Sequence, residues 1–114
     1  MSNPELSAKE HTVMAKGYII FTEKVNDQAA HGAYMEKALP TVLQRGGKLI
    51  VFDRDYTVIE GKWHGEQTII LELESVEAAN AWYNSDEYQA IIGERHAAAE
   101  NNAVIVSEFQ MPAS

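Results

Sequence analysis

The chain has 114 residues, of which 46% are hydrophobic and 23% are charged, and this composition is typical of one globular domain with a single core. Its 17 acidic residues outnumber its 9 basic residues, and the net charge of −8 argues against nucleic acid and anionic membranes as partners because most of the surface repels phosphate. The absence of cysteine excludes disulfides, thiolate nucleophiles, iron–sulfur clusters and cysteine-based zinc sites.

The two ends of the chain are polar. Residues 1–15 carry no sustained hydrophobic periodicity, so we expect a mobile or loosely docked arm. They lack the apolar core of a secretory signal, and no apolar run in the chain is long enough to cross a bilayer, so the sequence predicts a cytoplasmic protein that does not engage the membrane. One domain is predicted over residues 16–110, followed by a short tail at residues 111–114.

The first half of the domain predicts a strand, a helix and a second strand. Residues 17–25 are rich in β-branched and aromatic side chains, which favours a strand, and Asp27 supplies a helix N-cap signal. The helix predicted over residues 27–45 has apolar positions that recur at spacings of three and four: Tyr34, Met35, Ala38, Leu39, Val42 and Leu43. Pro40 lies inside this helix and is expected to kink or restart it before the Gly46-Gly47 stop.

The second half repeats the pattern with an additional helical break. Residues 47–53 and 67–74 predict two strands that are joined by a looser arm. Ser75 is expected to cap one helix, and Ser85 a further helical stretch that continues through Ala97. The last predicted strand covers residues 103–109.

The predicted order is β-α-β-β-α-β, which is the ferredoxin-like α+β fold: a four-stranded antiparallel sheet with both helices on one face. A sheet that is covered on one side only is expected to expose polar residues on the other. Here both alternating sets are apolar over much of their length, as in Ile19 and Phe21 against Tyr18 and Ile20. We therefore expect a second copy of the chain to cover the open face in a homodimer.

Three stretches resemble a known family. They are residues 34–47, with Pro40-Thr41 and the glycine pair, the EGKW of residues 60–63, and SVEAANAWYNSDEYQ of residues 75–89, which is the most specific. Together they resemble the uncharacterised bacterial family called domain of unknown function 1330. That family belongs to the dimeric α+β barrel superfamily, so the resemblance implies that two ferredoxin-like subunits pack sheet against sheet.

The resemblance leaves the reaction open, because this superfamily includes cofactor-independent monooxygenases, lactone isomerases, haem-dependent peroxidases and ligand-sensing domains. The chain also departs from the family pattern after Trp63, where His64 and Gly65 stand in place of a proline and a basic residue. If the basic residue binds an acidic ligand in relatives, this departure argues against the same contact here.

Aromatic residues gather around the break at residues 84–86. Trp82 and Tyr83 end one helix and Tyr88 lies in the first turn of the next, so the break brings them together. One interpretation is a structural corner in which Ser85 caps and the rings join the core. The other is a pocket between helix and sheet, with a tyrosine hydroxyl facing a small organic ligand.

Three further side chains have both a functional and a structural interpretation. Glu72 interrupts an apolar strand, where it is either a desolvated general base or a rim salt bridge. His64 is either an acid or base at a pocket mouth or a solvated turn residue. Arg95 follows Tyr88 by about two helical turns and either binds a carboxylate beside it or lies at the surface. His96 and Glu100 have i, i+4 spacing, but two ligands do not make a metal site, and no histidine stands out as a haem ligand.

The sequence therefore predicts one small pocket per subunit and no metal or cofactor. Its expected members fall into a catalytic and a ligand-binding set. The catalytic candidates are Glu72, His64 and Tyr88, and the ligand-binding candidates are Tyr34, Trp63, Trp82, Tyr83 and Arg95. Two functions remain open: a cofactor-independent enzyme, similar to a monooxygenase or an isomerase, that acts on a small organic molecule, and a non-catalytic module that binds a small metabolite.

Overall fold

The computed structural model describes residues 15–112, so nearly all of the predicted N-terminal arm and the last two residues of the predicted tail lie outside the described part. Eight elements follow one another in it. They are β1 (Gly17–Val25), α2 (Gln28–Leu43), β2 (Lys48–Asp53), β3 (Gln67–Leu73), α3 (Val76–Tyr83), α4 (Asp86–Gln89), α5 (Ile92–Ala98) and β4 (Ala99–Ser107). No helix among the described residues is long and apolar enough to span a membrane.

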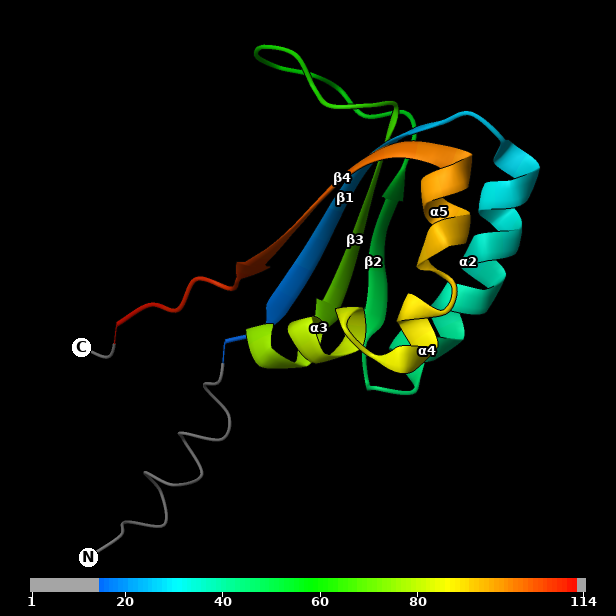
Figure 1. Cartoon of the computed structure of the whole chain (residues 1–114). Coiled ribbons are helices and arrows are strands. Elements are labelled where there is room, and N and C mark those ends of the chain that lie inside the picture. The colour runs from blue at the N-terminus through cyan, green and yellow to red at the C-terminus, as the bar shows by residue number, and fades with distance from the viewer. Residues whose placement is uncertain (1–14, 113–114) are drawn as a thin grey trace, which may run out of the picture.

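The four strands form one antiparallel sheet in the order β2-β3-β1-β4. This order confirms the predicted ferredoxin-like topology, in which the two strands that start each half lie side by side at the centre. The helices gather on one face of the sheet and leave the other open (Figure 1). On the helix side, Ile19 lies between Leu71 and Ile105 of the neighbouring strands and is 1% exposed, so the core lies between this face and the helices.

Helix α2 begins and ends where the sequence predicts. The side chain of Asp27 accepts a hydrogen bond from the Ala30 amide at 2.9 Å, which satisfies one of the free donors of the first turn. The helix continues through Pro40, so the predicted restart is wrong. Pro40 lies in the last turn on the exposed side, where solvent can replace the hydrogen bond that it removes. Gly46 then adopts a φ of 75° and ends the helix.

The open face is apolar, and a bulge in β2 changes which residues lie on it. The pairing of β2 with β3 shifts between Leu49 and Val51, so Ile50 is an extra, bulged residue. The bulge reverses the alternation, and Val51 therefore pairs with Ile70 on the open face instead of sharing the helix face with Leu49. Val104 lies on the same face and is 53% exposed.

Two predicted boundaries in the last third of the chain are wrong. The helical stretch after Ser85 is interrupted, since α4 ends at Gln89 and α5 begins at Ile92. Strand β4 begins at Ala99 rather than Ala103, because β1 runs on to Val25 and pairs with Ala99 there. The alanine and asparagine residues of 99–103 have weak strand propensity, and the cross-strand hydrogen bonds override it.

Candidate functional site

The break between α3 and α4 is a packed aromatic corner. The Ser85 side chain accepts a hydrogen bond from the Tyr88 amide at 3.2 Å, and this cap starts α4 in a new direction. The rings of Trp82 and Tyr88 are 4.0 Å apart between centroids, and both are 0% exposed. Trp82 Nε1 donates to Thr41 Oγ1 of α2 at 2.8 Å. Trp82 is therefore a core residue with a satisfied donor, and Tyr83 remains half-buried beside it.

A chain of hydrogen bonds runs from this corner to α5. The hydroxyls of Tyr34 and Tyr88 are 2.6 Å apart, and Arg95 Nε donates to the Tyr88 hydroxyl at 3.0 Å. The guanidinium carbon of Arg95 lies 4.9 Å from the centroid of the Phe21 ring. We call Tyr34, Tyr88 and Arg95 the Arg95 cluster. It joins three of the predicted site residues on the helix face of the sheet.

The charge states of the Arg95 cluster follow from its burial. Burial raises the pKa of Tyr34 and of Tyr88, so both hydroxyls keep their protons at neutral pH. Burial alone would lower the pKa of Arg95, but its interactions with Tyr88, Tyr34 and Glu23 outweigh this effect and raise the pKa. The cluster is therefore a cation held by a neutral tyrosine.

Arg95 is a buried cation without an ion-pair partner. It is 2% exposed, yet none of the four ion pairs within residues 15–112 includes it. Its terminal nitrogens make no hydrogen bond within the same residues, so Nε alone is engaged. Burial of a charge without a partner is unfavourable by roughly several kcal/mol per ion. Such a residue in a hollow of the surface marks a candidate site for a negatively charged group.

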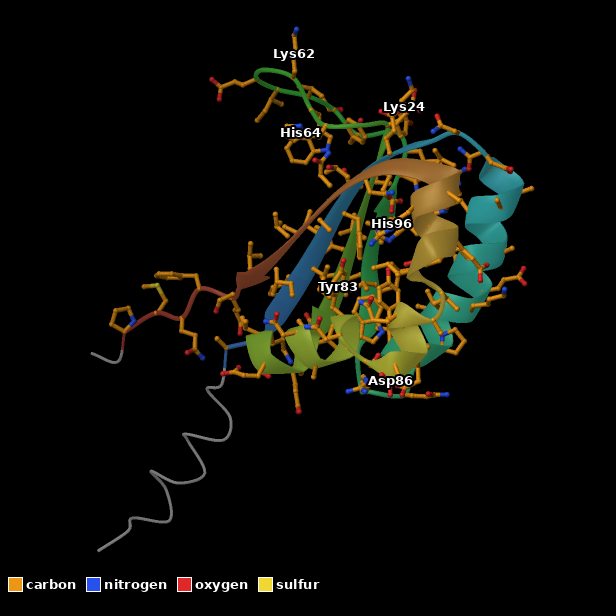
Figure 2. All side chains as sticks on the ribbon, viewed as in Figure 1. Lys24, Lys62, His64, Tyr83, Asp86 and His96 are labelled. Atoms are coloured by element: carbon orange, nitrogen blue, oxygen red, sulfur yellow. The ribbon has the colours of Figure 1, made fainter. Side chains whose placement is uncertain are left out.

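A groove of about 410 Å³ lies beside Arg95, between α3, α5 and β4. Its lining residues are Tyr83, Arg95, His96, Ala99, Asn101 and Ala103, and none of them is acidic. Figure 2 labels Tyr83 and His96, which enter this groove from α3 and α5. Asn101 Nδ2 donates to the Ala99 carbonyl at 2.8 Å, whereas Asn101 Oδ1 is buried and has no hydrogen-bond partner among the described residues. We call this feature the Arg95 groove.

The space between α2 and the sheet is much smaller. The cavity there has a volume of about 20 Å³ and is lined mainly by apolar side chains, with Arg95, Tyr34 and Glu23 at its polar end. This volume suits one water molecule and not an organic ligand. The predicted helix–sheet pocket is therefore closed at this position, and Arg95 contacts both the closed cavity and the open groove.

A second buried polar cluster was missed by the sequence interpretation. Glu23 Oε1 lies 3.0 Å from His31 Nε2 and accepts a hydrogen bond from Gln67 Nε2 at 2.7 Å, and all three residues are 1% exposed. Arg54 Nε donates to Gln67 Oε1 at 3.0 Å and extends the cluster to the loop after β2. The sequence pattern could have indicated that Glu23 is buried, because Glu23 continues the inward-facing alternation of Ile19 and Phe21 along β1. No sequence pattern indicated Asn101.

Glu72 lies away from the Arg95 cluster. It alternates along β3 with the core residues Leu71 and Leu73, so it is on the open face, and the sheet separates it from Trp82 and Tyr88. Tyr18 donates to its carboxylate at 3.2 Å, and Lys16 Nζ lies 3.9 Å away. The sequence prediction grouped Glu72 in one pocket with Trp82 and Tyr88, whereas the structure places it on the opposite face of the sheet.

Trp63 and His64 belong to the long loop between β2 and β3. Trp63 Nε1 donates to Thr68 Oγ1 at 2.8 Å, and the side chain is 49% exposed. His64 is exposed, and its ring centroid is 6.1 Å from that of Trp63. The loop encloses a separate hollow of about 320 Å³ that contains Trp63 and Thr68 but no residue of the Arg95 cluster. Figure 2 shows His64 near this loop, away from His96.

No group of three or more histidine, aspartate or glutamate side chains within residues 15–112 has an arrangement that would hold a metal ion.

The topology and the one-sided helix layer define a ferredoxin-like α+β domain, and comparisons with known proteins assign its family. The family model for a domain of unknown function, DUF1330, matches residues 16–109, and the chain belongs to that family. This match confirms the resemblance found in the sequence. No curated protein matches the chain.

Solved structures share the fold at low sequence identity. A protein of unknown function from Rhodopseudomonas palustris is 16% identical with a TM-score of 0.71, over 97% of each chain. SnoaB from Streptomyces nogalater, described as a cofactor-independent oxygenase, is 8% identical with a TM-score of 0.62, over 85% of this chain and 96% of that one. A dimeric ferredoxin-like protein of unknown function from Thermobifida fusca is 14% identical with a TM-score of 0.55, over 83% and 92%.

Proposed function

We propose that this protein is a cofactor-independent enzyme that acts on a small organic molecule bound in the Arg95 groove. One observation carries the proposal. Arg95 is a buried guanidinium without an ion-pair partner among the described residues, and it borders a hollow of ligand size. A fixed cation in a site of low dielectric constant stabilises negative charge on a substrate oxygen more than the same cation does in water.

The Arg95 cluster fixes the position of this cation. Tyr88 holds Nε from inside the core, and Tyr34 holds Tyr88 in turn, so the guanidinium does not have to reorganise when charge develops near it. Monooxygenase-like and isomerase-like reactions share a first step, in which a proton leaves a carbon atom next to a carbonyl group or a hydroxyl group on an aromatic ring. The resulting oxyanion is the species that Arg95 would stabilise.

His96 is the side chain in the groove that is suited to move this proton. It follows Arg95 directly, lines the same hollow and is exposed to solvent. Glu72 and His64, the proton carriers expected from the sequence, lie on the open face and in the β2–β3 loop. We therefore assign the proton transfer to His96 in this proposal.

The likeness to SnoaB supports the enzyme class through the fold. A protein with this architecture is described as a cofactor-independent oxygenase. At 8% identity the likeness extends to the fold alone, so the assignment of residues depends on the geometry of this chain.

A second candidate function is a non-catalytic module that binds a small metabolite in the same groove. One observation favours it: apart from Arg95 and Tyr83, His96 is the single titratable side chain that lines the groove within the described part of the chain. An enzyme that needs both an acid and a base would have to use His96 for both steps, whereas a binding module needs neither.

We also propose that the protein works as a homodimer through its open sheet face. Val104 and Val106 are 53% and 40% exposed there, and Val104 continues the apolar row of Ile20 and Ile70 across the sheet. A contiguous apolar face of this kind is typical of a subunit interface. The solved structure from Thermobifida fusca that shares the fold is described as dimeric.

The enzyme proposal is tested with a panel of enolisable carbonyl compounds and hydroxylated aromatic compounds. Proton exchange in D₂O is followed by NMR, and oxygen consumption is followed with an electrode. We expect turnover of at least one compound. Arg95→Met should abolish this turnover, and His96→Gln should reduce it by about tenfold or more, as is typical for the loss of a general acid or base. Arg45→Met is the matched control, because Arg45 pairs with Glu87 at the surface and its loss changes the net charge equally.

The outcomes separate the proposals. Turnover that survives Arg95→Met, or that is lost in Glu72→Gln, would place the chemistry outside the groove and contradict the proposal. Saturable binding without turnover of any compound would favour the metabolite-binding module.

A further inference from the structure

We propose that the C-terminal segment of one subunit, residues 108–112, docks in a hollow of its partner. The hollow lies between the open face of the sheet and the loop of residues 54–66, and it shares no lining residue with the Arg95 groove. This docking rests on the proposed homodimer and goes beyond it, because it states which parts of the two chains meet at the edge of the interface.

The hollow is continuous with the open face of the sheet. Its volume is about 320 Å³, and we call it the Trp63 hollow after a residue that lines it together with Val51, Tyr56, Val58, Ile59 and Thr68. Val51 pairs with Ile70 on the open face, and Thr68 shares that face because it is two residues from Ile70 along β3. Trp63 Nε1 donates to Thr68 Oγ1 at 2.8 Å, which holds the loop against this face. A subunit that covers the open face would therefore reach the rim of the hollow.

The chemistry of the Trp63 hollow suits a neutral apolar side chain. The Tyr56 hydroxyl and the Trp63 indole nitrogen already donate to partners within the domain, at 2.7 Å and 2.8 Å. The two rings meet edge to face with centroids 6.5 Å apart, so they offer carbon surface to a bound group. Asp53 and Glu60 also line the hollow and disfavour an anion. Ile59 is 88% exposed and gives the hollow an uncovered apolar wall.

The C-terminal segment carries two large apolar side chains that its own subunit leaves exposed. Phe109 is 77% exposed and Met111 is 79% exposed. Residues two apart in an extended chain point to the same side, so both can enter one hollow. The start of the segment is fixed, because the Glu108 amide donates to the Lys16 carbonyl at 2.8 Å and Glu108 Oε1 accepts from the Lys16 amide at 3.0 Å. Beyond this anchor the segment leads away from the sheet (Figure 1).

The C-terminal segment and the Trp63 hollow lie at diagonally opposite corners of the sheet. β2 and β4 are the two edge strands, and they run in opposite directions because every neighbouring pair is antiparallel. The loop of the hollow follows the end of β2, and the segment follows the end of β4. The two are therefore at opposite ends of the sheet as well as at opposite edges (Figure 1).

This arrangement excludes the hollow of the same chain and suits that of a partner. Met111 follows Ser107, the last residue of β4, by four positions and so reaches at most about 14 Å, whereas the nine residues of β4 span about 30 Å. A two-fold axis through the open face can exchange the two corners, and each segment then meets the hollow of the other subunit. The contact forms twice and closes, so it strengthens one dimer without linking dimers into chains.

Disulfide cross-linking tests the docking, because the chain has no cysteine of its own. Full chains with Met111→Cys and full chains with Ile59→Cys, one of them extended by a tag, are co-expressed, oxidised and separated without reductant. A disulfide forms only where the two Cα atoms come within about 7 Å. We expect the mixed covalent dimer to form roughly a hundredfold faster than with Leu43→Cys in place of Ile59→Cys, since docking raises the effective thiol concentration. Leu43 is the matched control, because it is 56% exposed at the end of α2.

Tryptophan fluorescence gives a second measurement that needs no cysteine. Of the two tryptophans, Trp82 is 0% exposed and Trp63 is 49% exposed in the single subunit, so quenching by acrylamide reports mainly on Trp63. Docking covers Trp63. The double variant Phe109→Ser/Met111→Ser should therefore raise the quenching constant and shift the emission to longer wavelength, whereas Leu43→Ser should change neither. All three proteins are compared at one concentration, with their mass measured by analytical ultracentrifugation.

The outcomes separate the docking from the homodimer. A dimer in which Met111→Cys reacts no faster with Ile59→Cys than with Leu43→Cys would overturn the docking and leave the homodimer intact. Unchanged quenching of Trp63 in the dimeric double variant would overturn the docking in the same way. A wild-type protein that is monomeric in ultracentrifugation would refute the homodimer and the docking together.

Discussion

Replacement of Tyr88 by phenylalanine tests whether the Arg95 cluster is one coupled unit. The Tyr88 hydroxyl is bonded to Tyr34 at 2.6 Å and to Arg95 at 3.0 Å, so Tyr88→Phe leaves two buried polar groups without partners. Each unsatisfied group destabilises the fold by about 1–3 kcal/mol, so the free energy of unfolding should fall by about 2–5 kcal/mol. Tyr34→Phe leaves the bond to Arg95 in place and should destabilise by only about 1 kcal/mol.

The coupling is measured by urea unfolding at one protein concentration, with the fluorescence of Trp82, whose ring lies 4.0 Å from Tyr88, as the signal. The double variant should be less destabilised than the sum of the two single variants, with a coupling of about 0.5–3 kcal/mol. Tyr56→Phe is the control, because its hydroxyl donates to the Gly65 carbonyl in an exposed loop, and it should change the free energy by about 0.5 kcal/mol or less. Additive effects, or a Tyr88→Phe protein as stable as the control, would refute the coupled cluster.

Three further predictions concern the fold, the tyrosines and the open face. Gly65→Ala should lower the melting temperature clearly in thermal denaturation, because Gly65 has a φ of +76° and an added Cβ would lie 2.6 Å from the Glu23 backbone. Gly93→Ala should not lower it, because an added Cβ there has no atom within 4 Å. The raised pKa of Tyr34 and Tyr88 keeps both protonated in the fold, so their contribution to stability should stay level below about pH 10 and fall above it as unfolded chains ionise. Ultraviolet tyrosinate absorbance that rises stepwise for all tyrosines before unfolding would contradict this. Val104→Lys should convert the proposed homodimer to monomer in analytical ultracentrifugation, and an unchanged mass would exclude this face as the interface.

Much of the fold could be predicted from the sequence because local signals and global topology agree. The strand over Gly17–Val25, the cap at Asp27 and the caps at Ser75 and Ser85 are confirmed. The start of β4 could not be predicted, because residues 99–102 are held by pairing with β1 and not by their own propensity. The bulge at Ile50 was equally invisible, since an extra residue leaves the apolar run unchanged.

The candidate site was predictable in part. Helical spacing indicated that Arg95 could reach Tyr88, and the structure shows that contact. The grouping of Glu72 with the aromatic residues could not be tested by spacing alone, because a strand residue faces one side of the sheet or the other according to register. The unpartnered oxygen of Asn101 depends on backbone carbonyls that only the folded chain brings together. The catalytic and ligand-binding roles of these residues stay predictions.

The most direct test of the central claim is the melting temperature of the protein as a function of the concentration of small carboxylates. A ligand that binds only the folded chain stabilises it by RT ln(1 + [L]/Kd), which is about 2.7 kcal/mol at one hundred times Kd. The wild-type protein and Arg45→Met should gain stability with at least one carboxylate in this way, and Arg95→Met should gain none at matched ionic strength. An equal gain in Arg95→Met, or no gain in the wild-type protein with any carboxylate, would contradict the assignment of Arg95 as the residue that binds a negatively charged ligand.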